Sequence, residues 1–224
     1  MLILKRTKEA FRRIREEKEY QIIYDEFSQY TMVPPRQFVS NLKLARSVAA
    51  IPGDVVECGT WKGGMIAGIA KVLGNSRDYF LFDSFEGLPP VEPIDGLAAK
   101  RWQQDTSSPK YYDNCTASEA DAADAMELSK IRNPRITKGW FKDTLPNQNF
   151  PNGIAILRLD ADWYKSTMQI LEALFQKVNS NGLIIIDDYY VWEGCTKAVH
   201  DYLSKNKLCF RIQSFEGICI IIKK

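Results

Sequence analysis

The sequence has no surplus of charge of either sign, because 30 lysines and arginines stand against 28 aspartates and glutamates in 224 residues. A net charge of +2 leaves no electrostatic footprint for nucleic acid, and we expect no such partner. The sequence also lacks a long apolar run of the kind that forms a signal peptide or a membrane span. We therefore expect a cytoplasmic protein that does not bind a membrane, and we leave its assembly open between a monomer and a homodimer.

Paired cysteines and clustered histidines are also missing. Five cysteines are scattered without a C-x-x-C pair, which argues against a disulfide framework or a zinc site and favours free thiols. The single histidine, His200, falls in a predicted helix without triad spacing, so we interpret it as a packing or surface residue. No serine or cysteine stands in a nucleophile-elbow pattern. Candidates for chemistry must therefore be sought among the carboxylates.

Hydrophobic periodicity predicts a single α/β domain, residues 1–224, with a doubly wound, mostly parallel sheet and a C-terminal antiparallel hairpin. An N-terminal helical cap (residues 1–50) precedes a core of residues 54–224. We expect a long loop over residues 88–116, because prolines, glycines and serines are frequent there. Predicted helices cover residues 5–30, 36–50, 65–73, 118–129, 166–178 and 193–203, and predicted strands cover residues 55–58, 79–83, 135–139, 154–160, 183–187, 209–215 and 218–222.

Two apolar strands that end in carboxylates carry the clearest functional signal. One predicted strand ends at Asp160, with Asp162 close by, and another ends at Asp187, followed directly by Asp188. Ligands of open α/β sheets bind beyond the carboxyl ends of the strands, so we expect these side chains to meet there. Clustered carboxylates repel one another unless a cation or a proton intervenes, and Mg²⁺ prefers such oxygen ligands. A single aspartate at a strand end is often only a turn residue, but three favour an ion site.

A glycine-bearing turn and a second acidic strand end lie earlier in the chain. Residues 56–64 read VECGTWKGG, which fits neither the G-x-G-x-x-G fingerprint nor a P-loop. Glu57 could accept hydrogen bonds from a ligand, but the turn alone is weak evidence, and a tight strand-to-helix connection explains it equally. Asp83 ends the next strand, 24 residues after Gly59, close to the spacing of about 20 seen for ribose-binding acids. We favour a ribose role for Asp83 over a turn or capping role.

Five motifs in order resemble the macrocin O-methyltransferase family, a branch of the class I S-adenosylmethionine-dependent methyltransferases. They are VECGTWKGG (residues 56–64), FDSFEGLP (82–89), KGWFKDTLP (138–146), LRLDADWYKST (157–167) and IIDDY (185–189). The resemblance implies a Rossmann-like fold, S-adenosylmethionine as methyl donor, Mg²⁺, and a hydroxyl acceptor on a sugar, glycosylated small molecule or glycan.

The resemblance also implies roles for individual residues. It assigns S-adenosylmethionine binding to Glu57, Gly59, Thr60, Trp61, Gly63, Gly64, Asp83, Ser84, Trp140 and Asp160, and metal binding to Asp160, Asp187 and Asp188. Asp160 would in addition be the catalytic proton acceptor. Two alternatives stay open, namely an O-methyltransferase for catechols or phenols and a non-catalytic nucleotide-binding protein of the same fold.

Overall fold

A computed structural model describes residues 2–224, with side chains from residue 15 onward, so Met1 and the side chains of residues 2–14 lie outside the description. The helices are α1 (Leu2–Phe27), α2 (Pro35–Ser47), α3 (Gly64–Leu73), α4 (Gly96–Gln104), α5 (Tyr112–Cys115), α6 (Glu119–Leu128), α7 (Phe141–Thr144), α8 (Tyr164–Leu174) and α9 (Glu193–Lys205). The strands are β1 (Asp54–Cys58), β2 (Tyr79–Asp83), β3 (Arg135–Lys138), β4 (Ile154–Leu159), β5 (Val178–Ile186), β6 (Gln213–Phe215) and β7 (Ile218–Ile222).

The strands form one sheet in the order β3-β2-β1-β4-β5-β7-β6. Neighbours from β3 to β5 pair in parallel, whereas β7 pairs antiparallel with both β5 and β6. The predicted doubly wound sheet and its terminal hairpin are therefore confirmed. The chain runs outward from β1 in both directions, so the carboxyl ends of β1 and β4 form the topological switch point where such sheets bind ligands.

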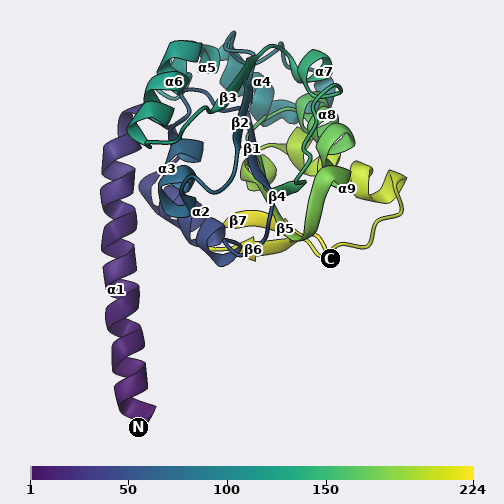
Figure 1. The fold of residues 1–224 in the computed structure, drawn as a ribbon. Coiled ribbons are helices and arrows are strands. Elements are labelled where there is room, and N and C mark those ends of the chain that lie inside the picture. The colour runs from purple at the N-terminus through teal and green to yellow at the C-terminus, as the bar shows by residue number, and fades with distance from the viewer. Residues whose placement is uncertain (1) are drawn as a thin grey trace.

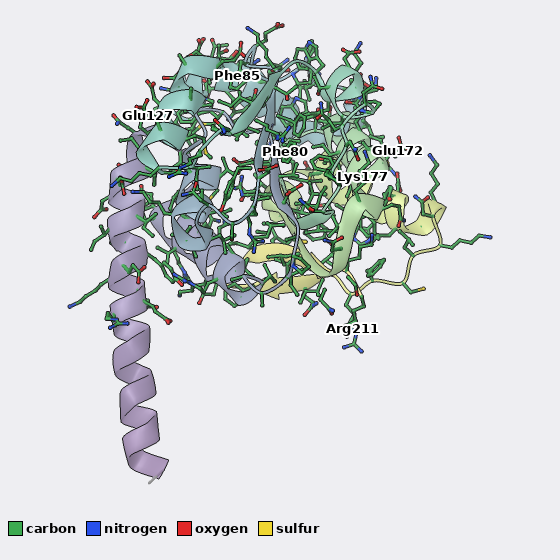
Figure 2. The ribbon with its side chains drawn as sticks, viewed as in Figure 1. Phe80, Phe85, Glu127, Glu172, Lys177 and Arg211 are labelled. Atoms are coloured by element: carbon green, nitrogen blue, oxygen red, sulfur yellow. The ribbon has the colours of Figure 1, made fainter. Side chains whose placement is uncertain are left out.

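Successive strand residues alternate between two hydrophobic cores, one on each face of the sheet. Val55 and Leu81 contribute to the core that α2 and α3 cover, whereas Val56 and Phe80 contribute to the core under α8 and α9. The two helix layers flank the sheet in Figure 1. Figure 2 shows Phe80 inside the domain and Arg211 pointing into solvent. Because both faces are covered, the parallel strands read as nearly continuous apolar runs rather than as alternating ones.

The N-terminal region extends away from the domain. Helix α1 projects from the α2 and α3 side as one long helix, with its N-terminal end far from the sheet (Figure 1). Its C-terminal half is anchored by Tyr20, Ile23 and Phe27, which are buried in the core with α2 and α3. Among residues 2–224, no helix combines the length and the hydropathy that crossing a membrane requires.

The prediction for residues 88–116 was wrong in part, because they do not form a continuous loop. A 3-10 turn (Pro93–Asp95) leads into α4, whose Ala99 is fully buried. Pro89, Pro90 and Pro93, which suggested a loop, stand before the helix, Gly96 is its first residue, and Glu92 and Asp95 form a capping box on the 3-10 turn. The strand predicted over residues 209–215 is also shorter, since β6 covers only Gln213–Phe215. All five cysteines are free thiols, as predicted.

Candidate active site

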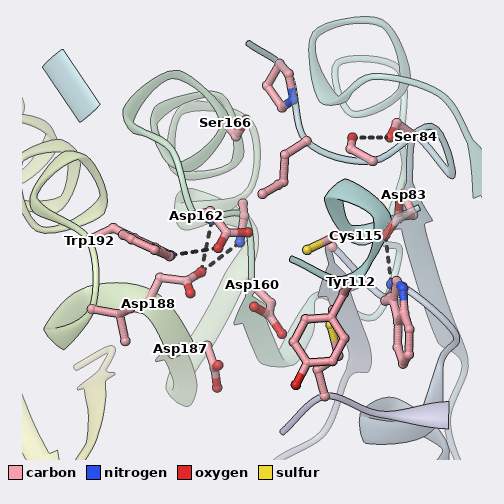
Figure 3. Close-up of a pocket in the computed structure, with 18 of the residues that line it drawn as sticks. Asp83, Ser84, Tyr112, Cys115, Asp160, Asp162, Ser166, Asp187, Asp188 and Trp192 are labelled. Atoms are coloured by element: carbon pink, nitrogen blue, oxygen red, sulfur yellow. Dashed lines mark hydrogen bonds between the residues drawn. The ribbon is translucent and has the colours of Figure 1, made fainter. Parts of the chain in front are cut away.

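A cavity of about 350 Å³ lies at the switch point, beyond the carboxyl ends of the parallel strands. Its wall includes Gly59 after β1, Asp83 at the end of β2, and Asp160 after β4. Asp187 and Asp188, in the 3-10 turn that follows β5, complete the acidic side (Figure 3). The volume falls within the range of about 300–1,000 Å³ that is typical of small-molecule sites.

The structure brings the three aspartates predicted to bind metal into one cluster. Asp160, Asp187 and Asp188 each offer a carboxylate oxygen within 4.8 Å of the other two. Burial raises the pKa of Asp188 and of Asp160, and the neighbouring carboxylates add to both increases. Three carboxylates thus crowd a small volume, and the all-oxygen donor set fits a hard cation such as Mg²⁺.

A buried arginine, which sequence reasoning missed, links this cluster to β1. Arg158 Nη1 donates to Glu57 Oε1 at 2.9 Å and to Asp160 Oδ2 at 2.7 Å, and Nη2 donates to Asp187 Oδ1 at 2.5 Å. Arg158 and Glu57 are both only 1% exposed. A charged residue inside an otherwise apolar strand was the available signal, because such residues are almost never buried without a partner.

A fourth carboxylate, Asp162, lies beside the cluster and lines the cavity. Its Oδ1 accepts a hydrogen bond from Trp192 Nε1 at 2.7 Å. Burial and the nearby Asp160 raise the pKa of Asp162 to about 7. Asp162 also has a positive φ of 55°, an uncommon conformation of the kind that is found at functional sites. Trp192 packs edge-on against the buried Trp163, with ring centroids 5.3 Å apart, so the position of this hydrogen bond donor is fixed.

On the opposite side of the cavity, Asp83 holds the glycine turn. Its Oδ2 accepts from the backbone N–H of Trp61 at 2.8 Å, and its Oδ1 accepts from the backbone N–H of Phe85 at 2.7 Å. Burial raises the pKa of Asp83, and these backbone donors oppose the increase. Each oxygen keeps a lone pair, so the carboxylate can still accept a ligand hydroxyl. Asp83 thus fulfils the turn role that the sequence left open, without losing its capacity to bind a ligand.

The residues predicted to bind the cofactor fall into two groups. Those lining the cavity are Gly59, Trp61, Asp83, Ser84, Trp140 and Asp160, whereas the described lining does not include Glu57, Thr60, Gly63 or Gly64. Glu57 is turned to Arg158 instead of the cavity. Packing accounts for the two glycines, because a Cβ at Gly64 would lie 2.6 Å from the carbonyl oxygen of Tyr30, and one at Gly63 would lie 3.1 Å from Ala122.

Two segments cover the cavity. The connection between α1 and α2 contributes Met32, Val33 and Pro34, and the region of residues 88–116 contributes residues that include Trp102 and Tyr112. His200, in contrast, is exposed on α9 and outside the described lining, where its Nε2 lies 2.8 Å from the Tyr189 hydroxyl. This placement agrees with the interpretation of His200 as a surface residue.

The strand order is that of the Rossmann-like fold of the class I methyltransferases. The cavity with its acidic walls lies at the switch point of this fold. The sequence profile of the macrocin O-methyltransferase (TylF) family matches residues 7–224, and the chain belongs to this family. The family resemblance of the five motifs is thereby confirmed.

Individual relatives support the assignment. The chain is 34% identical over 183 residues to the 8-demethyl-8-(2,3-dimethoxy-alpha-L-rhamnosyl)-tetracenomycin-C 4'-O-methyltransferase of Streptomyces olivaceus, and 34% identical over 161 residues to the demethyldecarbamoylnovobiocin O-methyltransferase of Streptomyces niveus. These matches cover 75% and 69% of this chain but only 64% and 60% of the relatives. The solved structure of the O-methyltransferase NovP is similar with a TM-score of 0.70 and 28% identity, over 87% of this chain and 82% of that chain.

Proposed function

We propose that the protein is an S-adenosylmethionine-dependent, Mg²⁺-assisted O-methyltransferase that acts on a hydroxyl of a sugar, glycosylated small molecule or glycan. The observation that carries the proposal is a single cavity with Asp83 on one wall and the cluster of Asp160, Asp187 and Asp188 on the other. Family membership supports the reaction type, and the rhamnosyl substrate in the name of the Streptomyces olivaceus relative supports a sugar acceptor.

The wall formed by β1 and β2 would hold the methyl donor. S-adenosylmethionine supplies an electrophilic methyl group on its sulfonium. Asp83 would accept ribose hydroxyls, with Ser84 beside it, and Trp140 would lie near the adenine, since all three line the cavity. Gly59 and Trp61 also line this wall, whereas Glu57, Thr60, Gly63 and Gly64 lie outside the described lining, and the two glycines allow the turn to pack closely. Fixing the donor in this way supplies rate by orientation.

The opposite wall would hold the metal and the acceptor. Asp160, Asp187 and Asp188 are the proposed Mg²⁺ ligands. Mg²⁺ in this place would lower the pKa of the acceptor hydroxyl and orient it. The covering segments, with Trp102 and Tyr112, would exclude water from the reacting groups.

Asp160 is the predicted proton acceptor, and the structure favours Asp162 as a second candidate. Asp160 already accepts from Arg158 at 2.7 Å, which opposes the increase in its pKa, and a metal held by the cluster would reduce its basicity further. Asp162 lines the same cavity and accepts a hydrogen bond from Trp192, whereas the ion pairs of Arg158 within the described residues go to Glu57, Asp160 and Asp187. If Asp162 accepts the proton, Asp162→Asn retains Mn²⁺ affinity and loses turnover by about 10²-fold or more, whereas Asp160→Asn loses both. Near-normal turnover of Asp162→Asn would return the role to Asp160.

Transfer of a radiolabelled methyl group from S-adenosylmethionine tests the reaction and the acceptor class together. The acceptor panel should contain rhamnosides and other glycosides, sugar nucleotides, and catechols or phenols as the rival class. We expect labelling of a glycoside or sugar nucleotide that excess EDTA abolishes and Mg²⁺ restores. Labelling only of catechols would replace the sugar acceptor, and full activity in EDTA would remove the metal.

A non-catalytic nucleotide-binding protein would have no need of the carboxylate cluster, and calorimetry showing no S-adenosylmethionine binding would remove the donor from the proposal.

Two further properties, the location and the assembly of the protein, stay predictions. We place the protein in the cytoplasm because its five cysteines are free thiols, which suits a reducing compartment. A homodimer can be checked by sedimentation.

A further inference from the structure

Arg158 pairs with three carboxylates at once, which is more than a single buried ion pair requires. Its guanidinium donates hydrogen bonds to carboxylates from three neighbouring strand segments, namely Glu57 in β1, Asp160 after β4 and Asp187 after β5. Breaking a buried pair of this kind is costly, and a buried ion pair is by itself weak evidence of a stabilising role. We therefore ask how the guanidinium of Arg158 affects the carboxylates that accept its hydrogen bonds.

The three carboxylates of the cluster share one pattern. Each has one oxygen held by a protein donor, since Arg158 holds Asp160 Oδ2 and Asp187 Oδ1, and the backbone N–H groups of Ala161 and Asp162 hold Asp188 Oδ2 at 3.0 Å. Among the described residues, the second oxygen of each carboxylate has no hydrogen bond. A carboxylate fixed by one oxygen presents the other in a defined direction.

Glu57 in turn fixes Arg158. Glu57 Oε1 accepts from Nη1, so the guanidinium cannot rotate freely between Asp160 and Asp187. The two carboxylates accept from different nitrogens of one planar group, an arrangement that the fork of arginine permits and the single ammonium of lysine does not. Glu57 Oε2 and Arg158 Nε are buried without a hydrogen bond partner among the described residues. The network therefore hydrogen-bonds the cluster carboxylates while two of its own polar atoms stay unpaired.

We infer that Arg158 is a positioning residue for the metal, which holds Asp160 and Asp187 so that one oxygen of each is presented to the ion, with Glu57 as its anchor. This inference rests on the proposed metal site. It gives Glu57 a role beside the acidic cluster in place of the cofactor contact that the sequence suggested. Partners that orient metal ligands typically contribute about 10–100-fold in metal affinity.

Mn²⁺ binding, followed by the electron paramagnetic resonance signal of the free ion, tests the inference without an acceptor. We expect Arg158→Lys, which keeps the charge and loses the fork, to bind Mn²⁺ about 10–100-fold more weakly than the wild type. Excess Mg²⁺ should restore turnover in this variant, since the ligands themselves remain. Glu57→Gln should weaken Mn²⁺ binding in the same direction through loss of the charged anchor.

Arg77→Lys is the matched control. Arg77 also donates from its guanidinium to three acceptors, the carbonyl oxygens of Ala49, Ile51 and Gly53, but at the amino end of β1. Both lysine variants should unfold at lower temperature, and only Arg158→Lys should lose Mn²⁺ affinity.

The outcomes separate the inference from the proposal beneath it. Wild-type protein that binds no Mn²⁺ would refute the metal site itself. Wild-type binding with equal affinity in Arg158→Lys would refute the positioning role alone, and tighter binding would show that Arg158 competes with the ion. If Arg158→Lys does not fold, Glu57→Gln decides by the same comparison.

Discussion

Replacing Gly59 by alanine tests whether the donor wall and the metal wall are built as one unit. Gly59 follows β1 with a φ of +84°, and a Cβ at this position would lie 1.7 Å from the backbone carbonyl oxygen of Asp160. The two chain segments are held together by the hydrogen bond from the Asp160 N–H to the Cys58 carbonyl oxygen. The added methyl group must therefore push Asp160 away from β1.

The structure gives the magnitude of this effect. A left-handed conformation costs an alanine about 1–2 kcal/mol, and overpacking adds about 1–3 kcal/mol. We expect Gly59→Ala to lower the free energy of unfolding by about 2–5 kcal/mol. In protein that remains folded, displacement of Asp160 by about 1 Å should reduce turnover by about 10²-fold.

Urea unfolding followed by circular dichroism measures the stability term, and Gly217→Ala is the control. Gly217 has a similar φ of +92°, but a Cβ there would meet nothing within 4 Å. This variant should lose only the conformational cost of about 1–2 kcal/mol and keep its activity. Equal destabilisation by the two substitutions would refute the close approach of Gly59 to Asp160.

Three further predictions concern single side chains. Trp192→Phe removes the indole N–H that Asp162 accepts, and we expect a folded protein with about tenfold lower turnover in steady-state assays; unchanged turnover would show that the bond is dispensable. Burial raises the pKa of Asp54, so ionisation of this residue destabilises the fold as the pH rises above its unfolded pKa. Asp54→Asn should therefore stabilise the protein by about 1 kcal/mol at pH 7, with the gain lost at acid pH in urea titrations; a constant gain would contradict this reasoning. Ser118→Ala removes the capping box of α6, in which Ser118 Oγ accepts from the Asp121 N–H, and should cost about 1 kcal/mol of unfolding free energy, measured by thermal unfolding; no loss would show that the cap is not limiting.

Much of the fold could be predicted because its signals are local. Strand residues such as Val55, Val56, Ile184 and Ile185 are all apolar, since helices cover both faces of the sheet. Ser118 was recognisable as the start of α6 from its side chain alone. The parallel arrangement follows from the alternation of strands and helices, and it places the acidic strand ends at one edge of the sheet.

The rest depended on contacts between distant parts of the chain. Arg158 and Glu57 are 101 residues apart in the sequence, so spacing could not pair them. The bond from the Trp61 N–H to Asp83 likewise requires the folded turn. Helix α4 was not recognised because prolines precede it and a glycine begins it. Glu57 pairs with Arg158, whereas the sequence suggested that it contacts a ligand.

A crystal structure with S-adenosylhomocysteine and Mn²⁺ tests the central claim most directly, because the anomalous signal locates the ion independently of the ligand. We predict one Mn²⁺ peak among Asp160, Asp187 and Asp188, and S-adenosylhomocysteine in the same cavity with its ribose at Asp83. S-adenosylhomocysteine bound elsewhere would contradict the account. So would a cluster without Mn²⁺ in which Arg158 still donates hydrogen bonds to Asp160 and Asp187.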